Sequence, residues 1–178
     1  MSEPTAIPPA GPQRSLRKTN LCEALRVCRE LSPSVAVPLP ALRALCEALV
    51  SGHDGDLALV AHSCAGAAGP LDILAHAGAV SAIPDLCLVA REDPLVDLIG
   101  AALLQGRPVV CRRTRTDPAH ARWAERAWRL GFSTACAAPF DVGPGRSGAL
   151  AVFSPGAHTF DADELDLLVD IAAALRRA

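Results

Sequence analysis

The stretch from Gly131 to Leu168, GFSTACAAPFDVGPGRSGALAVFSPGAHTFDADELDLL, contains two short apolar runs separated by a glycine-proline-glycine turn. The runs cover residues 134–140 and 148–153, and their length and composition are typical of strands buried on both faces. The turn at residues 143–145 favours a tight connection between them. The stretch therefore predicts a β-hairpin.

A helix is expected directly after this hairpin, over residues 161–177. Asp161 precedes it and Glu164 follows three residues later, which is the spacing of a capping box. Upstream, helical spacing of apolar residues predicts further helices, and short apolar runs predict further strands. The predicted helices cover 14–31, 40–50, 93–105 and 119–130, and the predicted strands cover 57–61, 71–77 and 108–112.

The predicted strands have little polar alternation, and hairpins lie at both ends of the strand set. Hairpins imply an antiparallel sheet, and apolar residues on both strand faces require helices on both sides. The sequence therefore predicts an α+β fold (an α/β sandwich), with a central antiparallel sheet of about five to six strands and helices on both faces. Pro108 places its strand near a sheet edge, because proline cannot donate a ladder hydrogen bond.

The chain resembles a GAF domain over roughly Leu39 to Leu175. The residues that carry the resemblance are Ser133, Pro139, Gly148-Ala149-Leu150, Phe160, Asp163-Glu164 and Leu167-Leu168, and upstream Gly106, Pro108-Val109-Val110, Asp117-Pro118, Trp123, Ala127 and Gly131. The pattern is most similar to sensory GAF domains that lie N-terminal to diguanylate cyclase or phosphodiesterase output domains. This resemblance implies a regulatory domain that binds a small ligand, mediates dimerisation or both, and that controls a cyclic-di-GMP output domain.

The 178 residues are enough for one domain with a short tail. Residues 1–13 hold four prolines and little hydrophobic pattern, so we expect a disordered tail. Residues 14–36 are interpreted as an N-terminal helix with its connector, and residues 37–178 as the GAF domain.

The composition excludes several partners. A net charge of −2 gives no reason to expect nucleic acid, and without a run of about 18 apolar residues we expect no membrane span. The seven cysteines lie mostly inside apolar runs and form no CxxC pair. This arrangement is typical of reduced, buried thiols in a cytoplasmic protein, without a zinc site.

A concave apolar pocket is expected where the helices Asp93–Gln105 and Asp117–Leu130 face the sheet. For each of the two tryptophans, packing in the core is an alternative to ligand contact. No cofactor is assigned, and haem ligation through His62 or His76 stays open. The candidate ligand-binding residues are His76, Arg91, Trp123, Arg126, Trp128 and Cys136.

No assembled catalytic set is recognisable, so the chain is predicted not to be an enzyme. One alternative is a thiol enzyme similar to the GAF proteins that reduce free methionine sulfoxide, with Cys87, Cys111 and Cys136 near the pocket. Such an enzyme needs a reactive thiol of low pKa. A second alternative is a structural dimer module without a ligand.

Self-association as a homodimer is predicted through the two terminal helices. Leu21, Leu25, Cys28 and Leu31 form an apolar stripe on the first helix, and the last helix is apolar over more of its perimeter than one sheet face needs. The alternative is that these two helices pack on each other within one chain.

Overall fold

A computed structural model of the protein describes residues 12–30, 38–52, 55–63, 71–83, 98–118, 121–156 and 160–176. At its centre lies a five-stranded sheet in the order β2-β1-β5-β4-β3, antiparallel throughout. The strands are β1 (Leu57–Ser63), β2 (Leu71–Gly78), β3 (Val109–Cys111), β4 (Thr134–Gly143) and β5 (Arg146–Ser154). Both predicted hairpins, β1–β2 and β4–β5, are confirmed, and the short strand after Pro108 is an edge strand as predicted.

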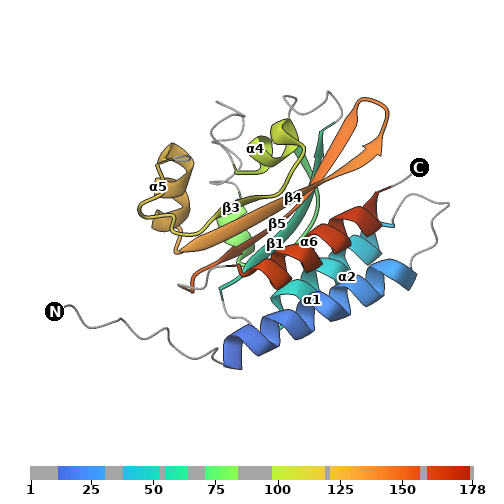
Figure 1. Ribbon diagram of the computed structural model, residues 1–178, viewed down its shortest axis with the longest axis horizontal. Helices are drawn as coiled ribbons and strands as arrows, with labels where there is room; N and C mark the ends of the chain where they lie inside the picture. Colours follow the sequence, from blue (N-terminus) through green and yellow to red (C-terminus); the bar gives the residue numbers. More distant parts are fainter. Residues whose placement is uncertain are drawn as a thin grey trace.

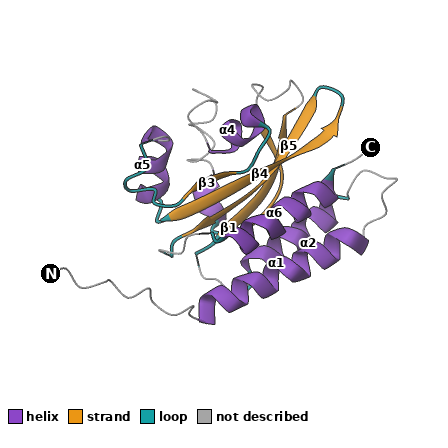
Figure 2. Ribbon diagram, viewed as in Figure 1, coloured by secondary structure: helices purple, strands orange, loops and turns teal. Residues whose placement is uncertain are grey.

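Helices cover both faces of this sheet (Figure 1). On one face lie α1 (Pro12–Glu30), α2 (Leu39–Val50) and α6 (Ala162–Leu175). On the other lie α4 (Leu98–Gln105) and α5 (Ala121–Arg129), with the short 3-10 turn η1 (Val80–Ala82). Figure 2 shows the same layers as helices on either side of the strands. The predicted α+β sandwich is thus confirmed for the described residues.

Each sheet face has its own apolar core. Along β1, Leu57 and Leu59 contribute to the core under α4 and α5, whereas Ala58 and Val60 contribute to the core under α1, α2 and α6. Successive strand residues point to opposite faces, so a sheet covered on both sides needs apolar residues at every position. This is why the strands show little polar alternation.

The C-terminal helix begins at the predicted capping box. The Asp161 carboxylate accepts a hydrogen bond from the Glu164 backbone N–H at 2.9 Å, and the Asp161 N–H donates to the Glu164 carboxylate at 3.1 Å. Glu164 is fully buried, so this reciprocal pair satisfies a charged group inside the fold as well as the helix end.

The two terminal helices pack on each other, and α1 also packs on α2, within one chain. Leu21, Leu25 and Cys28 of α1 are all buried in the core that also contains Leu168, Ile171 and Leu175 of α6. The apolar stripe of α1 is therefore used inside the monomer, as in the alternative to the dimer. Most of the predicted tail 1–13, the connector after α1 and the start of the predicted helix 93–105 lie outside the described residues.

Replacing Gly78 with alanine should lower the free energy of unfolding by at least about 2 kcal/mol. Gly78 has φ +93°, and an added Cβ would collide with the backbone carbonyl oxygen of Asp56. That oxygen accepts the Ala79 N–H at 2.9 Å, so it cannot move without loss. Gly106→Ala is the matched control, because Gly106 has φ +60° but open space around it. Urea denaturation should rank Gly78→Ala clearly below Gly106→Ala; equal losses would contradict the close approach.

Candidate functional site

The sheet face under α4 and α5 is built from small residues. Five alanines of β1, β4 and β5 contribute to its core, and α4 places Ala101 and Ala102 against that core. Small residues on both sides allow the helix and the sheet to approach closely, so α4 packs over β3, β4 and β5. The five alanines are Ala61, Ala135, Ala137, Ala149 and Ala151.

His76 lies on the same face, on the edge strand β2. It is placed opposite Leu59, which belongs to the core under α4 and α5, and cross-strand partners share a face. The ring is half-buried, and its Nδ1 is buried without a hydrogen-bond partner in the described part of the protein. A buried ring nitrogen of this kind costs free energy until a donor or acceptor reaches it. Among the predicted site residues that the structure describes, His76 therefore has a buried polar atom that a ligand could pair with.

The two tryptophans, both on helix α5, lie in different environments. Trp123 is fully buried and its ring lies 6.0 Å from that of Phe153, so it packs in the core. Trp128 is 43% exposed, and the Arg115 guanidinium lies 5.7 Å from its ring centroid. Arg126 is half-buried on the same helix, and Arg91 lies outside the described residues.

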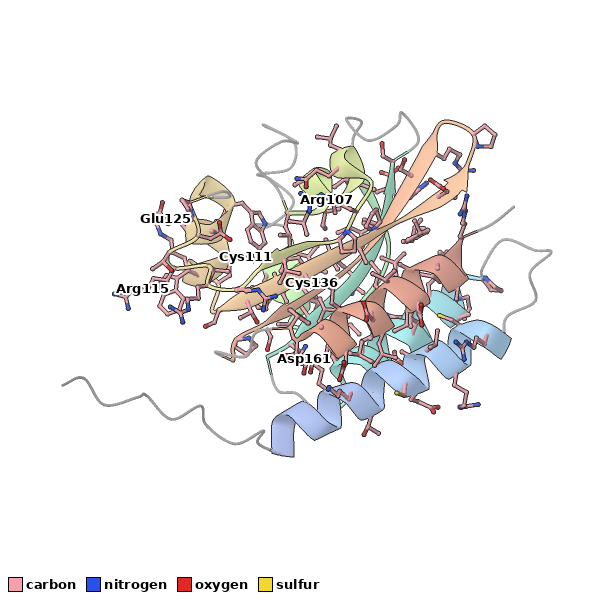
Figure 3. The ribbon with its side chains drawn as sticks, in the orientation of Figure 1. Arg107, Cys111, Arg115, Glu125, Cys136 and Asp161 are labelled. Carbon is pink, nitrogen blue, oxygen red and sulfur yellow. The ribbon has the colours of Figure 1, made fainter. Side chains whose placement is uncertain are left out.

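Cys136 lies on the sheet face opposite to Trp123, and this corrects the expected position near the pocket. It packs in the core under α1, α2 and α6, while Cys111 of the neighbouring strand packs under α4 and α5. Figure 3 labels both cysteines. The cause is strand alternation: Ala135 and Ala137, on either side of Cys136, already point to the α4 and α5 face.

Burial raises the pKa of three thiols. The pKa of Cys46, Cys111 and Cys136 is raised to about 12, in each case mainly because burial disfavours the thiolate. At Cys111 the nearby Asp117 carboxylate raises the pKa further. These thiols are therefore protonated at neutral pH, the opposite of what a thiol nucleophile requires.

We expect fewer than four of the seven cysteines to react rapidly with a chromogenic disulfide reagent under native conditions. Among the described cysteines Cys22 is exposed, and Cys28, Cys46, Cys111 and Cys136 are buried. Cys22→Ser should remove one rapidly reacting thiol, and Cys136→Ser should remove none. Four or more rapid thiols in the wild type would contradict the burial, and unfolded protein supplies the full count.

A concave region lies between the end of α4, the β4–β5 hairpin and α6. It is a cavity of about 200 Å³, bounded by an ion pair in which Arg176 and Asp141 lie 3.3 Å apart. It contains none of the predicted site residues, and no local sequence pattern indicates it, because its walls come from three segments that are distant in the chain. The lining residues are Leu103, Gly106, Pro139, Phe140, Asp141, Ser147, Val169, Ala173 and Arg176.

The described residues contain no group of three or more His, Cys, Asp or Glu side chains placed to hold a metal ion. In the same part of the chain, every helix is too short or too polar to cross a membrane.

The sheet order and the helices on both faces define this chain as a small α+β sandwich domain. The chain belongs to the GAF domain family, because the family model described as GAF domain (GAF_2) matches residues 41–178. A comparison with curated protein sequences finds no match.

Solved structures share the fold at low sequence identity. One is the N-acylhomoserine-lactone-dependent LuxR-family transcription factor CepR2 of Burkholderia cenocepacia, with TM-score 0.61, 16% identity and coverage of 90% of this chain and 91% of that chain. Another is the GAF domain of a phosphoenolpyruvate-protein phosphotransferase from Coxiella burnetii, with TM-score 0.60, 18% identity and coverage of 88% and 90%. A third is the free methionine-R-sulfoxide reductase of Neisseria meningitidis with its substrate, with TM-score 0.59, 16% identity and coverage of 93% and 89%.

Proposed function

We propose that this GAF domain is a regulatory domain that binds a small ligand on the sheet face under α4 and α5, with His76 as a ligand contact. The observation that carries the proposal is the buried, unpartnered Nδ1 of His76 on that face. A ligand group that donates to or accepts from this nitrogen would remove an unmet polar requirement. The apolar residues of that face, among them Leu59 opposite His76, suit a ligand that combines apolar surface with a polar group.

The proposal includes no catalysis by this chain. Its support is the raised pKa of Cys46, Cys111 and Cys136, which disfavours the thiolate that a sulfoxide reductase would need. Cys136 and Cys111 also lie on opposite sheet faces, so they do not form one thiol site. The likeness to the Neisseria meningitidis reductase is therefore a likeness of fold.

The output of the domain is proposed to be a cyclic-di-GMP enzyme, on the basis of the sequence resemblance alone. Dimerisation through α1 and α6 stays a prediction, and its apolar basis is smaller than expected because Leu25 is buried inside the chain. A ligand would change the activity of the output domain or the dimer by favouring one packing of the helices. The equilibrium between the two packings would shift by no more than the difference in the ligand's affinity for them.

A thermal-shift assay tests the ligand proposal with four probes: cyclic GMP, an N-acylhomoserine lactone, free methionine-R-sulfoxide and phycocyanobilin. A probe at about 100 times its Kd should stabilise the domain by about 2.7 kcal/mol, which raises the Tm by roughly 5–10 °C for a domain of this size. If no probe shifts the Tm, binding of these four ligand classes is contradicted.

His76→Leu should abolish that shift while keeping the stability of the free domain or raising it by up to about 1 kcal/mol, because a buried nitrogen without a partner is removed. His62→Leu is the matched control, since His62 is on the neighbouring strand but alternates with the residues that face α4 and α5. A shift that survives His76→Leu but not His62→Leu would place the ligand on the other face.

A further inference from the structure

Two segments of this chain carry opposite net charge. Residues 107–129 contain seven arginines against two acidic residues, whereas residues 161–170 contain five acidic residues and no basic one. The first segment includes α5 and the second is the start of α6, and these helices lie on opposite faces of the sheet (Figure 1). Arg112 donates to the Phe160 carbonyl at 3.1 Å, beside the acidic segment, whereas Arg115 lies over the Trp128 ring of α5. Arg115 therefore cannot neutralise the carboxylates of α6 within one chain.

The basic α5 surface is defined by Arg113, Arg115 and Trp128. Thr114 between the two arginines is buried: its N–H donates to the Ser133 carbonyl at 3.0 Å and its hydroxyl donates to the Phe132 carbonyl at 2.6 Å. This anchor holds the turn while both neighbouring arginines are exposed. Arg115 covers the exposed Trp128 ring at 5.7 Å, and Figure 3 shows Arg115 at the α5 end of the molecule.

Arginine and tryptophan side chains are the residues most enriched where protein interfaces concentrate their binding energy. Arg113 has no ion-pair partner within the described residues, and Arg115 contacts a ring in place of a carboxylate. The surface thus offers an exposed apolar ring with two cations, held on a fixed turn. Its complement is a surface with an exposed apolar side chain and two carboxylates.

The acidic α6 surface has that composition and is defined by Asp166, Val169 and Asp170. All three are exposed, Val169 by 37%. Asp166 and Asp170 are one helical turn apart, a spacing at which like charges repel. Two basic side chains close to α6 form ion pairs with other carboxylates. Lys18 pairs with Asp161 and Asp163, and Arg176 pairs with Asp141. In the described part of the chain, Asp166 and Asp170 have no basic partner.

We propose that the basic α5 surface of one copy binds the acidic α6 surface of a second copy. Trp128 would pack on Val169, and the two exposed arginines would face the two aspartates. The contact is between different surfaces, so it either closes as a reciprocal pair or continues as an open chain. It is independent of the proposed ligand site, because neither surface includes His76.

Sedimentation velocity of the wild type at two salt concentrations tests the attraction. At about 10 mM salt the Debye length is about 30 Å, and at about 1 M it is about 3 Å. We expect association at low salt, with an association constant that falls at least about tenfold at high salt. A wild type that stays monomeric at high protein concentration and low salt would overturn the proposal.

Charge exchange tests the surfaces themselves. Arg113→Glu with Arg115→Glu makes both surfaces acidic, and Asp166→Arg with Asp170→Arg makes both basic, so each variant alone should be monomeric. An equimolar mixture should associate again, because each acidic surface then meets a basic one. All four positions are exposed, so the substitutions should leave the fold intact. Circular dichroism of each variant checks this.

The matched control is Arg43→Glu with Glu47→Arg on α2, which changes exposed charges away from both surfaces and should associate as the wild type does. Association that persists in the Arg113→Glu, Arg115→Glu variant would overturn the proposal in favour of an α1 and α6 dimer, which those arginines do not touch. Monomeric behaviour of the mixture would overturn it as well.

Discussion

Replacing Arg17 with methionine is expected to lower the free energy of unfolding by about 3–5 kcal/mol, because it leaves the Asp56 carboxylate buried without its cation. Arg17 and Asp56 are 4% and 2% exposed, and their side chains form an ion pair at 2.6 Å. The same guanidinium donates to the Ser154 hydroxyl at 3.0 Å and lies 5.3 Å from the Phe160 ring centroid. One side chain of α1 thus joins the start of β1, the end of β5 and the segment before α6.

Urea denaturation of three variants separates the charge from the position. Arg17→Met alone should show the full loss, and Arg17→Met with Asp56→Leu should recover much of it, since a buried ion pair can be replaced by apolar residues at little cost. Arg26→Met removes a cation from an exposed pair with Glu23 and should unfold close to the wild type. If the double variant is as unstable as Arg17→Met, the loss comes from packing and not from an uncompensated charge.

Ala137→Asp should cost about 4 kcal/mol, which lowers the Tm by roughly 8–16 °C in a domain of this size. Ala137 is fully buried in the middle of β4, opposite Val109 of β3 and Ala151 of β5, and contributes to the alanine floor under α4. The residues that form the core around this position are apolar and offer a carboxylate no cation.

Ala162→Asp is the control for this substitution, because Ala162 is exposed in the first turn of α6, where a negative charge suits the helix dipole. Scanning calorimetry should show a large fall in Tm for Ala137→Asp and little change for Ala162→Asp. A wild-type Tm for Ala137→Asp would refute both the burial of this position and the strand that contains it.

Local features could be predicted wherever the residues that stabilise an element lie within the same segment. The β4–β5 hairpin follows from two apolar runs around the 143–145 turn, and α6 follows from the Asp161 and Glu164 capping box. The predicted helices 40–50 and 119–130 agree with α2 and α5 within two residues at each end, and the predicted end of helix 93–105 agrees with that of α4. These elements depend on neighbours in the chain, which are visible in the sequence.

The candidate site was less predictable, because it depends on contacts between distant segments. The sequence places His76 in a predicted strand, but only the pairing of β2 with β1 places it opposite Leu59 and reveals its unpartnered nitrogen. The two tryptophans of α5 look equivalent in sequence, whereas one is in the core and the other is exposed under Arg115.

An antiparallel sheet between helices, the resemblance to GAF domains and the apolar character of most strand positions are all predictable from the sequence. The face that each residue occupies depends on tertiary contacts, since Ala135, Cys136 and Ala137 are equally buried and their run contains no polar residue to mark the register. The same is true of Arg17, which looks like a surface residue of α1 until β1 brings Asp56 beside it. Burial depends on which elements pack together, so it cannot be predicted from one segment alone.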